Sequence, residues 1–142
     1  MTSKSWQELK SQLILHEGLR FKPYSDTVGK LTIGVGRNLT DVGIRKDEAM
    51  QMLENDLEEC IHDMEKFAWF NHLDEVRQRA VIDLRFNMGL NGLKTFKKFL
   101  TAMENGDYAV AGKELRESKW FKQVAFRGPR IVKMIEKGVP VE

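Results

Sequence analysis

The residues of this sequence best suited to chemistry are two carboxylic acids and a hydroxyl near the N-terminus, Glu17, Asp26 and Thr32. Two carboxylates on different elements that face one cleft can cleave a glycosidic bond. One protonates the leaving oxygen, and the other handles water or the developing cation. A threonine hydroxyl is too weak an acid to replace either carboxyl, but it can hold a water molecule or orient Asp26.

The surroundings expected for the two carboxyls differ. Glu17 continues an apolar helical stripe, so burial would disfavour its charged form and keep it ready to donate a proton. Asp26 follows the turn-prone Tyr24 and Ser25, where better hydration would keep it ionised. The spacing alone leaves a plainer interpretation open, in which Glu17 is a solvated surface group and Asp26 a turn residue.

A helix is expected over residues 5–17, and it positions Glu17 in its last turn. Ser5 followed by Glu8 indicates a capping box, and Gly18 is a typical helix stop. The apolar residues recur at helical spacing: Trp6, Leu9, Leu13 and Ile14.

Residues 20–37 are expected to form a β-hairpin with its turn at 27–30. From position 31 apolar residues alternate with Thr32, Gly34 and Gly36. This alternation places Thr32 and the glycines on an open face, where a ligand can approach the backbone. A loop over 38–45 follows.

The rest of the chain is expected to be helical, with a break at 89–92. The predicted fold is therefore α+β, with a small helix-plus-hairpin lobe, a larger all-helical lobe and a cleft between them as the candidate site. The expected helices cover residues 47–66, 73–88, 93–105, 107–118 and 128–137.

Length and composition bound the class of protein. A chain of 142 residues, 42% hydrophobic and 31% charged, is an ordinary globular domain. The N-terminus lacks the continuous apolar core of a signal peptide, and no stretch is long enough to span a membrane, so a chain made and kept soluble in a cytosol is expected. The single cysteine, Cys60, falls on an apolar stripe and is expected to be a buried thiol. The three histidines show no zinc-binding spacing, so no metal or cofactor is expected.

Charge is distributed unevenly along the chain. Residues 41–75 hold 3 basic and 11 acidic residues, whereas residues 94–142 hold 11 basic and 6 acidic ones. The basic segment is suited to an anionic polymer such as bacterial cell wall or nucleic acid. Solvated faces of amphipathic helices explain the same pattern, and both interpretations stay open.

The segment 13–40 resembles the phage lysozyme family, glycoside hydrolase family 24. That family's signature is a Glu, eight residues, an Asp, five residues and a Thr, which Glu17, Asp26 and Thr32 match. The segment 79–89 resembles the family's cleft-lining helix, and 118–130 resembles its C-terminal tryptophan and arginine motif.

The resemblance implies a role for each matching residue. Glu17 would be the general acid, Asp26 the second catalytic carboxylate, and Thr32 the residue that positions the attacking water. It also implies substrate binding or cleft lining by four more residues: Asn38, Phe86, Asn87 and Arg127. Arg127 would lie near Glu17, and an ion pair that only fastens the two lobes is the alternative role for it.

The implied protein is a muramidase that hydrolyses the β-1,4 bond between N-acetylmuramic acid and N-acetylglucosamine in peptidoglycan. It would be a single lysozyme-like domain over 1–142, with one lobe at about 13–50, an N-terminal helix packed on the other lobe, and that lobe at about 51–142. The biology implied is a monomeric endolysin that waits in the host cytoplasm for a holin, without membrane insertion and without nucleic acid as a partner. The alternatives are a lytic transglycosylase and a non-catalytic module that binds cell wall or nucleic acid.

The sequence departs from the family pattern in three places. Arg37 replaces a frequent histidine, and by analogy with the family's best-known member it is expected to pair with Asp56. His16 replaces an acidic residue there and is expected to be a surface residue. The loop 38–45 is shorter than in that member, so the cleft should be more open on that side.

Overall fold

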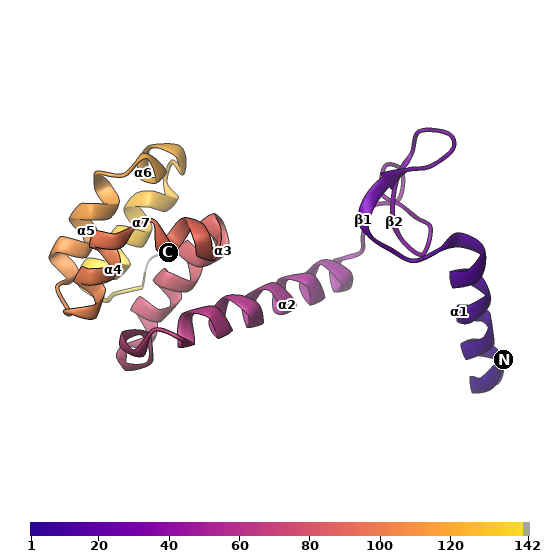
Figure 1. Cartoon of the computed structure of the whole chain (residues 1–142), viewed down its shortest axis with the longest axis horizontal. Helices are drawn as coiled ribbons and strands as arrows, with labels where there is room; N and C mark the ends of the chain where they lie inside the picture. The colour runs from indigo at the N-terminus through magenta and orange to yellow at the C-terminus, as the bar shows by residue number, and fades with distance from the viewer. Residues whose placement is uncertain (141–142) are drawn as a thin grey trace. The chain divides into compact units, whose positions relative to one another are not determined.

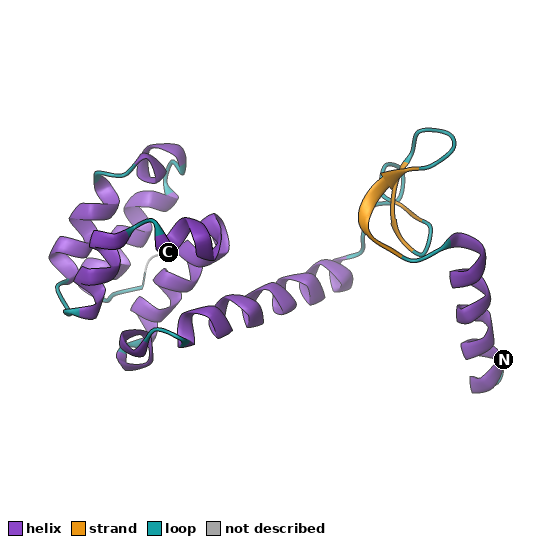
Figure 2. Ribbon diagram, in the orientation of Figure 1, coloured by secondary structure: helices purple, strands orange, loops and turns teal. Residues whose placement is uncertain are grey.

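The computed structural model describes residues 1–140 and divides the chain into two compact units (Figure 1). The first unit is Met1–Gln51 and the second begins at Met52, so the division falls inside the helix α2, Lys46–Glu65. Residues 141 and 142 of the expected second lobe lie outside the described residues. Among residues 1–140 all strands lie in the first unit and most of the helical residues in the second (Figure 2), which confirms the α+β class.

The first unit consists of one helix, the start of α2 and a small sheet. Its elements are α1 (Ser3–Glu17), β1 (Arg20–Ser25), β2 (Leu31–Gly34) and β3 (Arg37–Asn38), and the strands form an antiparallel sheet in the order β1-β2-β3. The helix α1 begins two residues before the predicted start. Thr2 rather than Ser5 is the N-cap, because the Thr2 hydroxyl accepts a hydrogen bond from the Ser5 N–H at 3.0 Å.

Burial along β2 is the reverse of the predicted pattern. Thr32 is only 4% exposed, whereas Leu31 is 44% exposed. The reason is the third strand, which the hairpin prediction lacked. Thr32 lies opposite Tyr24 of β1 and Asn38 of β3, so neighbours on both sides cover it.

Among the described residues of the second unit every secondary-structure element is a helix, and each of the five helices predicted from residue 47 onward has a counterpart in the structure. Two five-residue elements, η1 and α6, were not predicted, because so short a segment shows no periodic pattern. The predicted break lies within α3, where Gly89 has a non-helical φ of 78°. After α2 the elements are η1 (Ala68–His72), α3 (Glu75–Lys94), α4 (Lys97–Glu104), α5 (Tyr108–Arg116), α6 (Lys119–Gln123) and α7 (Arg127–Lys137).

The hydrophobic core of the chain lies in the second unit, where buried side chains from successive helices pack against one another. Cys60 is buried as predicted, and burial raises the pKa of its thiol. The largest fully buried side chains are Phe99, Met64, Leu84, Leu93, Met103, Leu115 and Ile135.

An ion-pair cluster ties α2 to α3 within the second unit. The Arg85 Nε lies 2.8 Å from Oδ2 of Asp63, and its Nη2 lies 3.5 Å from Oε1 of Glu59. The side chains of Arg85 and Asp63 are 14% and 13% exposed. The hydrogen bond from Arg85 holds the pKa of the Asp63 carboxyl below its usual range, so the pair stays charged at neutral pH.

Candidate active site

The carboxylate of Asp26 is held through one of its two oxygens. Its Oδ1 accepts hydrogen bonds from the N–H groups of Val28 at 2.9 Å and of Lys30 at 2.8 Å. The turn that presents these groups is closed by the Asp26 N–H, which donates to the Lys30 carbonyl at 2.8 Å, and Gly29 supplies its positive φ of 80°. The other oxygen, Oδ2, has no protein partner among residues 1–140, so it is free to take a proton or bind water.

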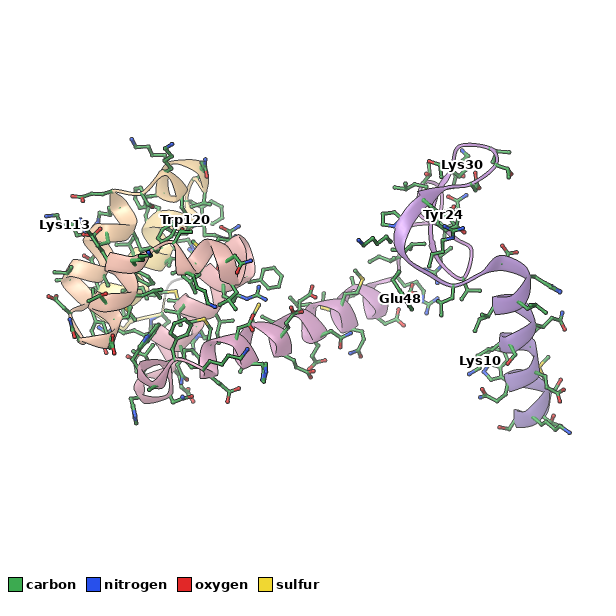
Figure 3. All side chains as sticks on the ribbon, viewed as in Figure 1. Lys10, Tyr24, Lys30, Glu48, Lys113 and Trp120 are labelled. Atoms are coloured by element: carbon green, nitrogen blue, oxygen red, sulfur yellow. The ribbon has the colours of Figure 1, made fainter. Side chains whose placement is uncertain are left out.

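The hydroxyl of Thr32 forms a hydrogen bond with the backbone of Lys30, the residue that also binds Asp26. It donates to the Lys30 carbonyl at 3.0 Å, and the side chain is almost fully buried. Because the hydroxyl proton is used in this bond, the Thr32 oxygen faces any bound water as an acceptor. The structure therefore joins Asp26 and Thr32 through the backbone of Lys30, whose side chain is labelled in Figure 3.

The carboxylate of Glu17 ends α1 and lies against the turn between β2 and β3. A Cβ atom placed on Gly36 would be 2.7 Å from the Glu17 Oε2, so a larger residue at position 36 would force the Glu17 carboxylate to shift. The two residues border a hollow of about 400 Å³ together with Lys10, Leu13 and Ile14 of α1, and Val35. Glu17 is thus placed beside apolar side chains, although its own side chain is exposed.

Asn38 lies opposite Thr32 in the sheet, but its amide is already engaged. Its Nδ2 donates to Oδ2 of Asp41 at 3.0 Å, and its Oδ1 accepts from the Asp41 N–H at 2.9 Å. A contact between Asn38 and substrate stays a prediction. The contacts present in the structure make Asn38 a brace for the loop that follows β3.

The predicted pair of Arg37 with Asp56 is wrong, because Arg37 binds Glu48. The Nη1 of Arg37 lies 2.8 Å from Oε1 of Glu48 and also donates to the Gly43 carbonyl at 3.3 Å. Since the loop before α2 is short, Arg37 reaches the first turn of that helix, and Asp56 lies about 12 Å further along it. The hydrogen bond from Arg37 lowers the pKa of Glu48 to about 2.

Three predicted site residues lie in the second unit, Phe86 and Asn87 on α3 and Arg127 at the start of α7. Phe86 is 42% exposed. Asn87 is held by a residue that the sequence did not connect with it, because its Oδ1 accepts a hydrogen bond from the Trp120 Nε1 at 2.8 Å. The Nε of Arg127 lies 3.4 Å from Oδ1 of Asp83, which makes Asp83 its ion-pair partner in this unit.

A groove of about 850 Å³ lies beside Trp120 in the second unit. Its lining combines aromatic and apolar side chains with three lysines and two glutamates, and Figure 3 labels Trp120 at this place. Sequence reasoning missed this groove, since its residues come from four helices and share no motif. The charged residues of its lining are Lys97, Lys98, Lys119, Glu114 and Glu117.

The described residues contain neither a candidate metal site nor a helix that could span a membrane. Among residues 1–140 no group of three or more histidine, cysteine, aspartate or glutamate side chains could hold a metal ion. In the same part of the chain no helix is long and apolar enough to cross a membrane.

The α+β fold presents two carboxylates and an oriented hydroxyl around a small sheet. These are the kinds of group that a glycoside hydrolase uses. Comparison with sequence models of protein families identifies the family of hydrolases to which the chain belongs. The sequence model of the Phage lysozyme family matches residues 15–135, and the chain belongs to this family. It is therefore a lysozyme-type enzyme that hydrolyses the bacterial cell wall.

Relatives of known name span most of this chain. It is 28% identical to "Probable T4-type lysozyme 1" of Dictyostelium discoideum, over 92% of this chain and 94% of that protein. It is 30% identical to the "Pre-baseplate central spike protein Gp5" of Enterobacteria phage T4, over 86% of this chain and 26% of that longer protein. It is 27% identical to the "SAR-endolysin" of Escherichia phage Mu, over 81% of this chain and 67% of that protein. The family resemblance seen in the sequence is confirmed.

Proposed function

We propose that this enzyme is a muramidase that hydrolyses the β-1,4 bond between N-acetylmuramic acid and N-acetylglucosamine in peptidoglycan. Glu17 is the general acid, Asp26 the general base and Thr32 the residue that orients water. The observation that carries the proposal is that the Lys30 backbone holds both Asp26 and Thr32, while Oδ2 of Asp26 has no protein partner among the described residues and the Thr32 oxygen can still accept a hydrogen bond.

A water molecule that attacks a sugar must donate its protons and direct a lone pair outward. The free Oδ2 of Asp26 accepts one proton, and the Thr32 oxygen accepts a hydrogen bond from the other O–H. With both O–H bonds engaged, the water oxygen presents its lone pair to the anomeric carbon. Attack by such a water inverts the configuration at that carbon.

Glu17 supplies the proton for the leaving oxygen. It lies against Gly36, beside apolar side chains and on a different element from Asp26, and in the proposed mechanism the two carboxyls flank the scissile bond. We propose that Phe86, Asn87 and Arg127 bind peptidoglycan. Asn38 would add a further contact from the first unit. The charged groove beside Trp120 is suited to the peptide stems, which carry both carboxylates and amines.

The deciding experiment is digestion of purified peptidoglycan by the wild-type protein and by Glu17→Gln, with mass analysis of the products. New reducing N-acetylmuramic ends from the wild type and none from the variant support the proposal. Glu8→Gln is the matched control, because Glu8 is an exposed glutamate on the same helix. It should cleave as the wild type does.

Other products would contradict parts of the proposal. Anhydro-muramic ends would identify a lytic transglycosylase and remove the role of Asp26 in water activation. New ends on the glucosamine side would assign a different bond. A β-anomer as the first product, observed by rapid proton NMR, would mean that Asp26 forms a covalent adduct and that the configuration is retained.

We further propose that the enzyme acts as a monomeric endolysin that stays in the host cytoplasm until a holin gives it access to the wall. The name of one phage relative, the "SAR-endolysin" of Escherichia phage Mu, supports the endolysin role. Expression in a bacterial host with and without a holin tests this: lysis only with the holin is expected, and lysis without it would contradict the proposal. Sedimentation equilibrium should give the mass of one chain.

A further inference from the structure

Lys30 connects the two groups that we assign to water activation. Its N–H donates to Oδ1 of Asp26 at 2.8 Å, and its carbonyl accepts from the Thr32 hydroxyl at 3.0 Å. A displacement of this one residue would therefore move both partners of the attacking water together. The position of the Lys30 backbone is a requirement of the proposed mechanism.

Apolar packing does not fix the turn that contains Lys30. The side chains of Thr27 and Val28 and the backbone of Gly29 are exposed, and Val28 is 75% exposed. Leu31 after the turn is also exposed, at 44%. Hydrogen bonds rather than burial must hold this segment in place.

Besides the hydrogen bonds to Asp26, this segment is held by the loop clamp, by which we mean residues 38–41, from the end of β3 onward. The Thr40 Oγ1 accepts from the Leu31 N–H at 2.9 Å, and the Leu39 N–H donates to the Leu31 carbonyl at 2.7 Å. Asp41 binds the Lys30 ammonium, with 3.3 Å between Nζ and Oδ2. The clamp thus binds the side chain of Lys30 through an ion pair and the backbone of Leu31 through two hydrogen bonds.

We propose that Thr40 and Asp41 are positioning residues, which hold the Lys30–Leu31 segment and through it the geometry of Asp26 and Thr32. The inference rests on the proposed function, because it assigns that geometry to water activation. Thr40 carries the larger share, since its bond is to the backbone. Asp41 contributes less, because its ion pair with Lys30 is about half exposed and screened by solvent.

The activity test compares Thr40→Val, Thr40→Ser and Asp41→Asn on soluble peptidoglycan fragments. Thr40→Val keeps the shape of the side chain but removes the acceptor. We expect it to lower kcat about tenfold or more with KM within about twofold, because misplaced groups slow the chemical step without weakening binding. Thr40→Ser should restore most of the activity, and Asp41→Asn should lower kcat by about threefold.

Two control variants separate positioning from general damage. Asp47→Asn removes a more exposed ion pair, that of Asp47 with Arg45, from the same unit. Thr101→Val makes the same change on an exposed face of α4. Both should keep the wild-type kcat. A wild-type kcat in Thr40→Val would overturn the proposal, and so would an equal loss of kcat in the controls.

Amide hydrogen exchange gives a readout that does not depend on activity. In Thr40→Val the Lys30 N–H should lose about tenfold of its protection, while amides of α3 keep theirs. Unchanged protection at Lys30 would overturn the proposal even if kcat falls. If the wild type cleaves no wall, the proposed function fails, and the exchange of Lys30 still shows whether the clamp holds the turn.

Discussion

At the scale of single residues, the contact between Glu17 and Gly36 limits which residues are tolerated at position 36, in the turn after β2. We expect Gly36→Ala to lose at least about tenfold in kcat, because the new Cβ would lie 2.7 Å from the Glu17 Oε2 and push the carboxylate aside. The variant should also lose about 1–2 kcal/mol of unfolding free energy, since alanine must adopt a φ of 66°. Wall-clearing rates and urea unfolding measure the two effects.

Gly34→Ala is the matched control for that prediction. Gly34 has a similar φ of 70°, but a Cβ on it would have nothing within 4 Å. Its loss of stability should be similar and its loss of activity much smaller. Equal losses of activity in the two variants would mean that backbone strain, and not the displacement of Glu17, is responsible.

The pair of Glu48 with Arg37 makes a pH-dependent contribution to stability. The folded protein keeps Glu48 charged down to a pKa of about 2, whereas the unfolded chain protonates it near its usual 4.5. The unfolded state therefore binds more protons in this window, and the stabilisation is present above pH 4.5 and lost as pH falls toward 2. We expect the difference in Tm between wild type and Glu48→Gln to shrink over that range.

A double-mutant cycle identifies the partner in that effect. Arg37→Ala should remove the same pH-dependent part of the stability, and adding Glu48→Gln to it should change little further. An unchanged pH dependence in Arg37→Ala would mean that Arg45, whose N–H also binds Glu48, is the dominant partner.

At the scale of elements, the joint between α2 and α3 depends on Arg85. We expect Arg85→Ala to cost roughly 1–3 kcal/mol of unfolding free energy, because it leaves the mostly buried Asp63 carboxylate without its closest partner. Urea denaturation measures the change. Lys66→Ala is the control: Lys66 is 61% exposed and lies 3.8 Å from the same carboxylate, so its loss should be below about 0.5 kcal/mol. Equal losses would contradict the prediction.

Long elements could be read from the sequence, and short ones could not. The periodic stripes of α1 and α2 span several turns and predict these helices to within one or two residues. The strand β3 has two residues, and two residues carry no alternation. Its omission is the reason that the burial of Thr32 was predicted wrongly, because a third strand turns β2 from an edge into the centre.

At the scale of the whole molecule, the uneven charge predicts how wall binding responds to salt. The inactive Glu17→Gln should bind purified peptidoglycan less tightly as salt rises, because the basic segment 94–142 is attracted to an anionic polymer. Replacing Lys97 and Lys98 of the groove by alanine should weaken binding and flatten the salt response. Replacing Lys113 and Lys133, which are exposed outside the groove lining, is the control. Equal effects would favour the interpretation of the basic residues as a merely solvated surface.

The candidate site was predictable in its residue types but not in its bonds. The spacing of Glu17, Asp26 and Thr32 and the family resemblance named those residues. The hydrogen bonds that fix Asp26 and Thr32 involve peptide groups of Val28 and Lys30, and a peptide group has no sequence signature. Likewise, Arg37 pairs with Glu48 and not with Asp56 because of the length and path of the loop between β3 and α2. The sequence did not predict that path.

The use of peptide groups around Asp26 has a consequence for how the enzyme tolerates change. Every amino acid except proline supplies the N–H that Val28 donates, and the Val28 side chain is 75% exposed. In a library that samples all twenty residues at position 28, we therefore expect wall clearing by every variant but the proline one. Failure of many others would show that the side chain itself touches the substrate. This surface position close to the proposed catalytic carboxylate would then be open to a label or a tether.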